Sequence, residues 1–153
     1  MFSRIDYSEL SAQLRLNYAI RPDLTLETYA EPFASVGRFY SFGELAEPET
    51  NDLLFYDDGG RSIVRDEDGD YLVTDGAQQF TIGDPDFQVM SFRSNVVLRW
   101  EWRPGSTLFL VWQQDRSGGG LPTRSVRPGD LGDAFSADGD NFLAVKATYW
   151  LPL

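Results

Sequence analysis

The sequence contains no cysteine and no histidine, and each absence removes a class of chemistry. Without cysteine there are no disulfides and no thiolate nucleophiles. Without histidine there is no histidine-dependent catalytic triad, and the cysteine and histidine ligands of common zinc sites are absent. Lysine is almost missing, since Lys146 is the only lysine among 13 basic residues. Arginine supplies the rest and suits fixed ion pairs in a polar interior. Much of the usual catalytic repertoire is therefore absent, and we expect neither enzymatic activity nor a cofactor.

Long apolar runs and an excess of positive charge are also lacking. No stretch of about 18 apolar residues occurs, so no transmembrane helix is expected, and residues 1–7 do not resemble the apolar part of a signal peptide. The net charge of -11 argues against a nucleic-acid partner, whose phosphates need basic side chains. With 42% apolar and 14% aromatic residues, the chain is expected to fold as one domain.

The clearest pattern in the chain is the alternation of apolar and polar residues that is typical of β-strands. It is strongest in residues 91–103, where one face carries Phe92, Val96, Leu98, Trp100 and Trp102 and the other carries Arg93, Asn95, Arg99, Glu101 and Arg103. Similar segments are residues 8–20, 24–40, 106–115 and 141–153. Short turns at 21–23 and 104–105 and long acidic connections at about 41–88 and 117–140 join them. The sequence therefore predicts an all-β fold, an antiparallel meander of five long strands within a single partial domain over residues 1–153.

The two faces of these strands differ sharply in chemistry, which favours lipid on one side and a charged, aqueous lumen on the other. We expect the C-terminal part of a transmembrane β-barrel in a bacterial outer membrane, with its C-terminus in the periplasm. The residues expected to line the lumen are Arg15, Glu27, Glu31, Arg93, Arg99 and Glu101. An aromatic girdle is expected from Tyr18, Trp100, Trp102 and Tyr149. The partners would be the lipid bilayer and either upstream strands of a longer precursor or other copies that complete the sheet.

Segment 106–115 is apolar on both faces, so its orientation depends on the turn before it. A three-residue turn, residues 104–106, places Leu110 and Trp112 on the same face as Leu98 and Trp100, whereas a two-residue turn reverses the faces. We expect the first arrangement. Across the first turn we expect Ile20 opposite Leu24, and Arg15 within ion-pairing distance of Glu27 and Glu31.

The acidic clusters include candidate metal ligands. Asp66, Asp68 and Asp70 match the first three ligands of an EF-hand loop, but Tyr71 occupies the position that requires glycine. Solvated turn residues in a small hairpin around Asp68 and Gly69 are the stronger interpretation, and no metal is expected.

Two other patterns point away from catalysis. Glu27 and Glu31 share a face, but four residues along a strand separate them by about 13 Å, too far for a glycosidase pair. Gly118, Gly119 and Gly120 lack the lysine that follows in a phosphate-binding loop, so they are expected to form a flexible loop tip.

Several of these segments together resemble a known bacterial family. They are Asp-Pro-Asp-Phe at 84–87, the run from 91 to 114 with its core Arg-Trp-Glu-Trp-Arg-Pro-Gly-Ser-Thr, Tyr-Ala-Glu-Pro-Phe at 29–33, and residues 142–151. They resemble the C-terminal region of domain-of-unknown-function family 5916, whose members look like outer-membrane β-barrel proteins, often with a carbohydrate-binding-like domain before the barrel. The resemblance implies that this chain is the C-terminal piece of a longer precursor. It implies no catalytic residues.

Two other functions fit the same pattern. A soluble up-and-down β-barrel would turn the apolar face inward and bind a small apolar ligand. A sugar-binding sheet would use the exposed rings of Trp112 or Trp150, a hypothesis that rests on analogy with the family alone.

Overall fold

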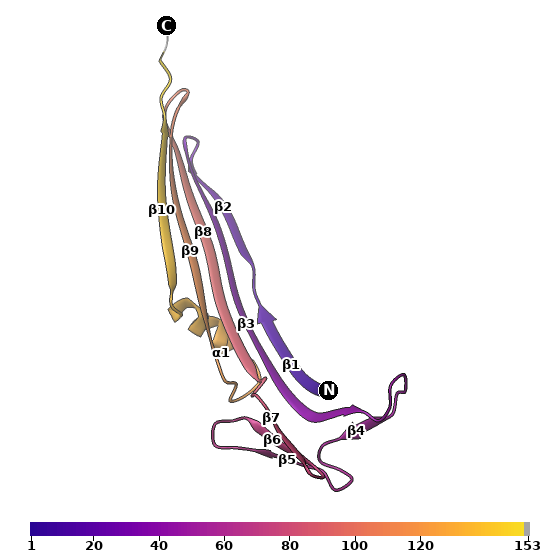
Figure 1. Ribbon diagram of the computed structural model, residues 1–153. Helices are drawn as coiled ribbons and strands as arrows, with labels where there is room; N and C mark the ends of the chain where they lie inside the picture. The colour runs from indigo at the N-terminus through magenta and orange to yellow at the C-terminus, as the bar shows by residue number, and fades with distance from the viewer. Residues whose placement is uncertain (152–153) are drawn as a thin grey trace.

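The computed structural model describes residues 1–151 and is mostly β, with 66% strand and one short α-helix. One long antiparallel sheet contains seven strands, and a small sheet of three strands lies beyond one end of it (Figure 1). The all-β prediction is confirmed at this level, and the described residues form no closed barrel. The long sheet comprises β1 (Phe2–Ser11), β2 (Leu14–Arg21), β3 (Leu24–Leu45), β4 (Leu53–Phe55), β8 (Phe87–Arg103), β9 (Ser106–Gly120) and β10 (Gly139–Thr148). The small sheet comprises β5 (Ser62–Arg65), β6 (Tyr71–Asp75) and β7 (Gln78–Ile82).

The seven strands of the long sheet occupy five columns. β1 and β2 pair one after the other with the same edge of β3, and β4 continues the column of β8 along the other edge. The order across the sheet is then β1/β2, β3, β8/β4, β9 and β10. The turns of both hairpins, β2–β3 and β8–β9, lie together at the end opposite the small sheet (Figure 1).

The predicted strand over residues 8–20 is interrupted at residues 12–13, opposite Pro32. Proline offers its neighbour a carbonyl but no N–H, and only the Ala12 N–H still donates across the gap, to the Pro32 carbonyl at 3.1 Å. Ser11 lies opposite Phe33 and Leu14 opposite Ala30, so the register is the same on both sides. Pro32 therefore interrupts the neighbouring strand, although the register shifts at Pro32 neither in that pairing nor in the pairing of β3 with β8.

The β8–β9 register confirms the predicted faces. Leu98 lies opposite Leu110, and Val96 lies opposite Trp112. The turn itself has two residues, with Gly105 at φ 78°, and an irregularity between Glu101 and Arg103 shifts the register by one. The turn is one residue shorter than predicted, and the one-residue shift compensates for this. Leu110 and Trp112 therefore lie on the face predicted for a three-residue turn.

The β2–β3 hairpin is built in a similar way. Arg21 lies opposite Leu24, so the predicted pairing of Ile20 with Leu24 is wrong, and an irregularity between Ala19 and Arg21 restores the register. Leu16 then lies opposite Thr28.

The two long connections are shorter and more ordered than predicted. β3 continues to Leu45 and β8 begins at Phe87, and residues between them form β4 to β7, including the expected hairpin with Arg65 opposite Tyr71. The second connection contains α1 (Pro128–Asp133) and a 3-10 turn (Ala134–Ser136). Among residues 1–151 no helix is long and apolar enough to cross a membrane. The predicted last strand ends at Thr148, and residues 152–153 lie outside the described part.

Burial is concentrated at the small-sheet end of the molecule. Phe42, Tyr56 and Val73 form a buried cluster where the small sheet meets the end of β3. On the long sheet, the buried Phe92 ring lies 4.3 Å, centroid to centroid, from Phe135 of the 3-10 turn. The helical segment therefore covers the apolar face near the small sheet, and the rest of that face has no cover among the described residues.

Gly118 to Gly120 lie in β9, so the predicted loop tip is wrong. A Cβ on Gly119 would come within 2.6 Å of the Gln88 carbonyl oxygen of β8, whereas a Cβ on Gly120 would meet nothing within 4 Å. The close approach of two backbones explains a glycine at position 119.

Gly119→Ala is expected to destabilise the sheet by about 1–3 kcal/mol, because the new methyl group forces β8 and β9 apart. Gly120→Ala, its neighbour in the same strand, is the matched control and should be neutral or slightly stabilising. Urea titration of both variants refolded in liposomes measures the difference. Equal midpoints for the two would contradict the paired position of Gly119.

Candidate functional site

One face of the long sheet carries a wide, uncovered set of apolar side chains. Even-numbered residues of β2, β3, β8 and β9 share this face with odd-numbered residues of β10, as the registers require. Eight of its large residues are 38–64% exposed: Leu14, Leu16, Tyr18, Trp100, Leu110, Trp112, Leu143 and Val145. Contiguous apolar surface of this extent is unusual on a soluble monomer and marks a surface that contacts something else.

This apolar face is a band with a polar lower border. Ser94 donates to Gln114 at 3.1 Å, and Gln114 donates to Asn141 at 2.9 Å, so a hydrogen-bonded row crosses three strands. From that row to Trp100 the strand advances six residues, about 20 Å. The band is thus similar in height to the apolar belt of about 25 Å on transmembrane β-barrels.

The four residues predicted to form a girdle lie at one end of this band, beside the hairpin turns. The Trp100 indole donates to Asp23 of the β2–β3 turn at 3.2 Å, and its ring lies edge-on to Trp102 with centroids 6.4 Å apart. Arg103 donates to the Tyr149 hydroxyl at 3.4 Å. Tyr18 is paired with Leu26, two rungs from the β2–β3 turn. Trp100 and Tyr149 therefore combine an apolar ring with a polar partner at the turn end, as residues at a membrane–water boundary do.

The opposite face of the sheet brings the six predicted lumen residues together. Across the strands, Glu31 lies opposite Arg93, and Arg93 lies opposite Asp115, with 3.8 Å between Arg93 Nε and Asp115 Oδ1. Arg99 and Glu101 lie two residues apart on the same face of β8, and 3.5 Å separates Arg99 Nη2 from Glu101 Oε2. This face is a network of opposite charges in which most side chains remain accessible.

The predicted ion pairs of Arg15 are replaced by a stacking contact. Tyr29 lies directly opposite Arg15, and the guanidinium sits 5.1 Å from the centre of its ring. The Tyr29 hydroxyl donates to Glu31 at 2.5 Å, and Gln13 also donates to that carboxylate, at 3.1 Å. Within residues 1–151 no ion pair joins Arg15 to Glu27 or Glu31, because Tyr29 stands between them.

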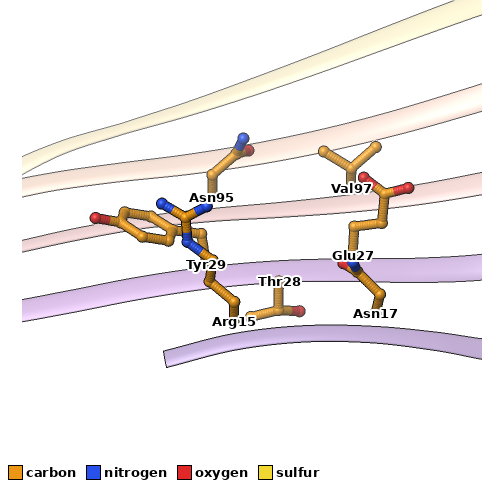
Figure 2. Close-up of a pocket in the computed structure, with 7 residues that line it drawn as sticks. All are labelled: Arg15, Asn17, Glu27, Thr28, Tyr29, Asn95 and Val97. Carbon is orange, nitrogen blue, oxygen red and sulfur yellow. The ribbon is translucent and has the colours of Figure 1, made fainter. Parts of the chain in front are cut away.

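The polar face is hollowed by adjoining recesses. One recess of about 360 Å³ is lined by Arg15, Asn17, Glu27, Thr28, Tyr29, Asn95 and Val97 (Figure 2). A second, of about 330 Å³, shares Tyr29 and Asn95 and extends over Arg93, Gln113 and Asp115 to Phe142. Tyr29 and Gln113 also belong to this surface and were not among the predicted residues, although the alternation places both in phase with Glu31 and Asp115.

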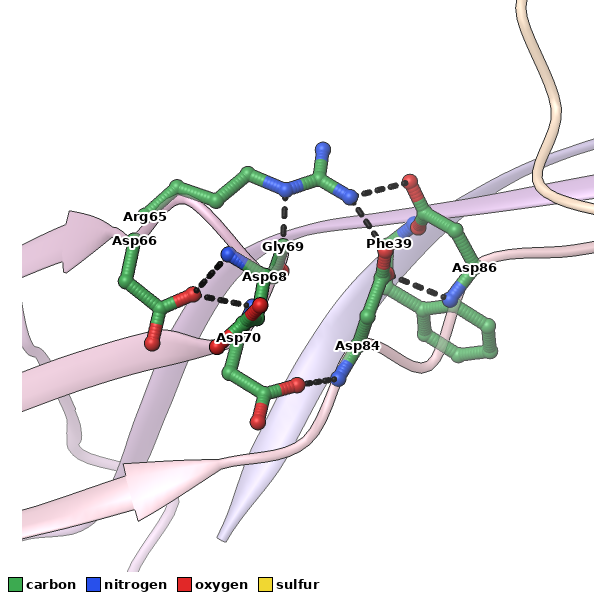
Figure 3. A network of polar contacts seen from close by, with 8 residues as sticks. All are labelled: Phe39, Arg65, Asp66, Asp68, Gly69, Asp70, Asp84 and Asp86. Atoms are coloured by element: carbon green, nitrogen blue, oxygen red, sulfur yellow. Dashed lines mark hydrogen bonds and ion pairs between the residues drawn. The ribbon is translucent and has the colours of Figure 1, made fainter.

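The acidic residues weighed as metal ligands have structural roles in the small sheet. The Asp66 carboxylate accepts the backbone N–H groups of Asp68 and Asp70, at 3.0 and 2.9 Å, and closes the β5–β6 turn (Figure 3). Asp70 accepts the Asp84 N–H at 2.9 Å, and the Asp84 carboxylate pairs with Arg65. Among residues 1–151 no group of three or more potential ligands is arranged to hold a metal ion.

The net charge of the protein is located in one segment, which we call the acidic cap and define as residues 41–88. It holds 13 of the 24 acidic residues and only Arg61 and Arg65 of the 13 basic ones, so the rest of the chain is neutral overall. The cap contains the small sheet and the cluster around Val73. A strongly charged surface therefore lies at the end of the sheet farthest from the hairpin turns (Figure 1).

The helical segment on the apolar face is held by Asp130, whose residue exposure is 2%. Its carboxylate accepts two hydrogen bonds from the Arg124 guanidinium, at 2.9 and 2.5 Å, and one from the Arg127 N–H at 2.8 Å. The Arg124 contact, followed by the Arg127 N–H, lowers the pKa of Asp130. Since the folded pKa is the lower one, the stabilising effect is complete above an ordinary aspartate pKa of about 4 and is lost as the pH falls through the lowered value.

No family model, curated protein or solved structure matches this chain. The resemblance to family 5916 therefore stays a prediction. The chemistry of the two sheet faces is what points to a function.

Proposed function

We propose that this chain is a non-enzymatic segment of a bacterial outer-membrane β-barrel, with lipid against the apolar face and water against the Arg/Glu face. The observation that carries the proposal is the separation of the two faces of one sheet. One face exposes leucine, valine and aromatic side chains, and the other carries ion pairs and hollows. Alternation of this kind lets one strand face lipid and lumen at once.

Exposed apolar side chains favour a lipid environment energetically. Fully burying a large apolar side chain contributes roughly 1.5–3 kcal/mol, and the eight residues on this face, which are 38–64% exposed, would each gain about half of that. The acyl chains of a bilayer would remove the whole band from water without a protein partner. The girdle residues at the turn end, such as Trp100 with its hydrogen bond to Asp23, fit the boundary between acyl chains and headgroups.

The orientation follows from the lengths of the connections. Outer-membrane barrels have short periplasmic turns and longer outer loops. The two-residue turns between β2 and β3 and between β8 and β9 are then periplasmic, and the acidic cap and helical segment are outside. An aqueous interior lined by Arg93, Glu31 and Asp115 suits transport of polar solutes, and the acidic cap suits surface binding.

The soluble-barrel alternative buries the opposite face. It requires the apolar band to be concave and closed around a ligand. The larger recesses lie instead on the polar face, at Tyr29 and Asn95, and the helical segment packs on the apolar side at Phe92. Both features support lipid, not an apolar ligand, as the environment of the band.

Tryptophan quenching in brominated lipid tests the proposal. Trp112 is 43% exposed in the middle of the band, whereas Trp150 follows β10 and packs beside Gly105 of the β8–β9 turn. With the other three tryptophans replaced by phenylalanine, a Trp112-only variant refolded with brominated phosphatidylcholine liposomes should lose most of its fluorescence. A Trp150-only variant should lose much less. Quenching of Trp150 but not of Trp112 would reject the lipid-facing assignment.

A further inference from the structure

The long sheet has two open edges in its described part, and both edge strands run in the same direction. One edge is the β1/β2 column, and the other is β10. Every pairing between them is antiparallel, from β2 to β3, β3 to β8, β8 to β9 and β9 to β10. Direction reverses at each of these four steps, so the first and fifth columns are parallel to each other.

The shared direction of the two edge strands restricts what can complete the sheet. In a closed antiparallel barrel the direction alternates all the way round, so the number of columns is even, as in the bacterial single-chain barrels. We infer that the partner of this sheet supplies an odd number of strand columns, and that its own first and last strands run opposite to β2 and β10. Since the smallest such barrels have about eight strands, the partner supplies at least three columns.

A second copy of this chain in the same membrane orientation is not that partner. Its β2 edge would meet β10 in parallel, against the antiparallel rule of the whole sheet. Two copies can pair their β10 edges only through a two-fold axis that points their acidic caps in opposite directions. Such a pair would place one cap, with its net charge of -11, on each side of the membrane.

The edges also specify the chemistry of the partner strands. β10 presents Leu143 and Val145 on the apolar face and Phe142 and Lys146 on the polar face, without a proline. A strand that adds to β10 needs the same alternation in phase, with apolar residues continuing the band. An edge strand of this kind, long and without a bulge in its pairing with β9, is open to pairing by another strand.

The inference rests on the proposed function, and cysteine cross-linking tests it separately. The chain has no cysteine, so single cysteines report one contact each. Leu143→Cys and Leu16→Cys lie in the same row across the sheet, through Thr28, Val96 and Trp112. The two variants are refolded with liposomes, alone and mixed, and treated with a bismaleimide whose reach is short, about two strand spacings. Val64→Cys, on the cap, gives the collision background.

Since the inferred partner is not a copy in the same membrane orientation, the expected result confines any excess of dimers over background to the Leu143→Cys sample, in which two β10 edges can pair antiparallel. Mixed dimers, which join a Leu143→Cys chain to a Leu16→Cys chain, should stay at background. An excess of mixed dimers would overturn the inference, since copies would then pair in parallel in one orientation. Background yields for every combination agree with the inference, because the strands that complete the sheet are absent from these samples. Trp112 quenching by brominated lipid in the same samples reports the membrane assignment independently of either outcome.

Discussion

Replacing Leu98 with arginine is expected to destabilise the membrane-bound sheet by about 2–4 kcal/mol. Leu98 lies in the middle of the apolar band, between Leu26 of β3 and Leu110 of β9. A guanidinium at this depth would lose its hydration and gain no counter-charge from its neighbours. The penalty is the one found for charged residues on the lipid face near the middle of a barrel.

The adjacent residue provides a matched control. Val97 points to the polar face, lines the recess with Asn17 and lies opposite Glu27. In Val97→Arg the new cation would meet a carboxylate in an aqueous setting, so the change in stability should be small. Denaturant titration of both variants refolded in liposomes measures the two free energies of unfolding. Equal penalties would show that the two faces of β8 do not differ in environment.

Replacing Val73 with aspartate is expected to unfold the small sheet of the acidic cap. Val73 is completely buried, and it packs with Phe42 and Tyr56 in the core of the cap. A carboxylate there would be desolvated among apolar and aromatic side chains, which costs about 4 kcal/mol or more. The long sheet should persist, because its strands pair with one another independently of β5 to β7.

Amide hydrogen exchange separates local from global unfolding in this variant. Residues 62–82 should lose protection, while β8 and β9 keep theirs. Val64→Asp is the control, because Val64 lies in the same small sheet but is 60% exposed. Loss of protection in β8 and β9 of Val73→Asp would mean that the cap and the long sheet fold as one unit.

The faces of the sheet could be predicted from sequence because alternation has a period of two and does not depend on the exact turn. At the β8–β9 turn the predicted length was wrong, yet Leu110 and Trp112 share the face of Leu98. An irregularity near Arg103 compensated for one missing residue. The six lumen residues and the four aromatic residues could be grouped for the same reason.

Features that depend on contacts distant in sequence were out of reach. The first strand begins at Phe2, because the end of β3 extends far enough to pair with it. The small sheet needs Val73 and Ile82 to meet Phe42, a contact that no local pattern contains. Gly119 looks like a loop residue in sequence, and only its approach to Gln88 shows that a strand requires it. Tyr29 was missed because its role depends on Arg15 and Glu31 together.

The most direct measurement of the central assignment is the hydrodynamic state of residues 1–153 without detergent. If the apolar band faces lipid, the open sheet exposes it to water together with two unpaired edges, so the chain should aggregate or form oligomers. Size-exclusion chromatography with light scattering should then give a dispersed species only when detergent or liposomes are present. A detergent-free monomer with a cooperative thermal transition would contradict this account, because the apolar band would then have to be covered by the protein itself.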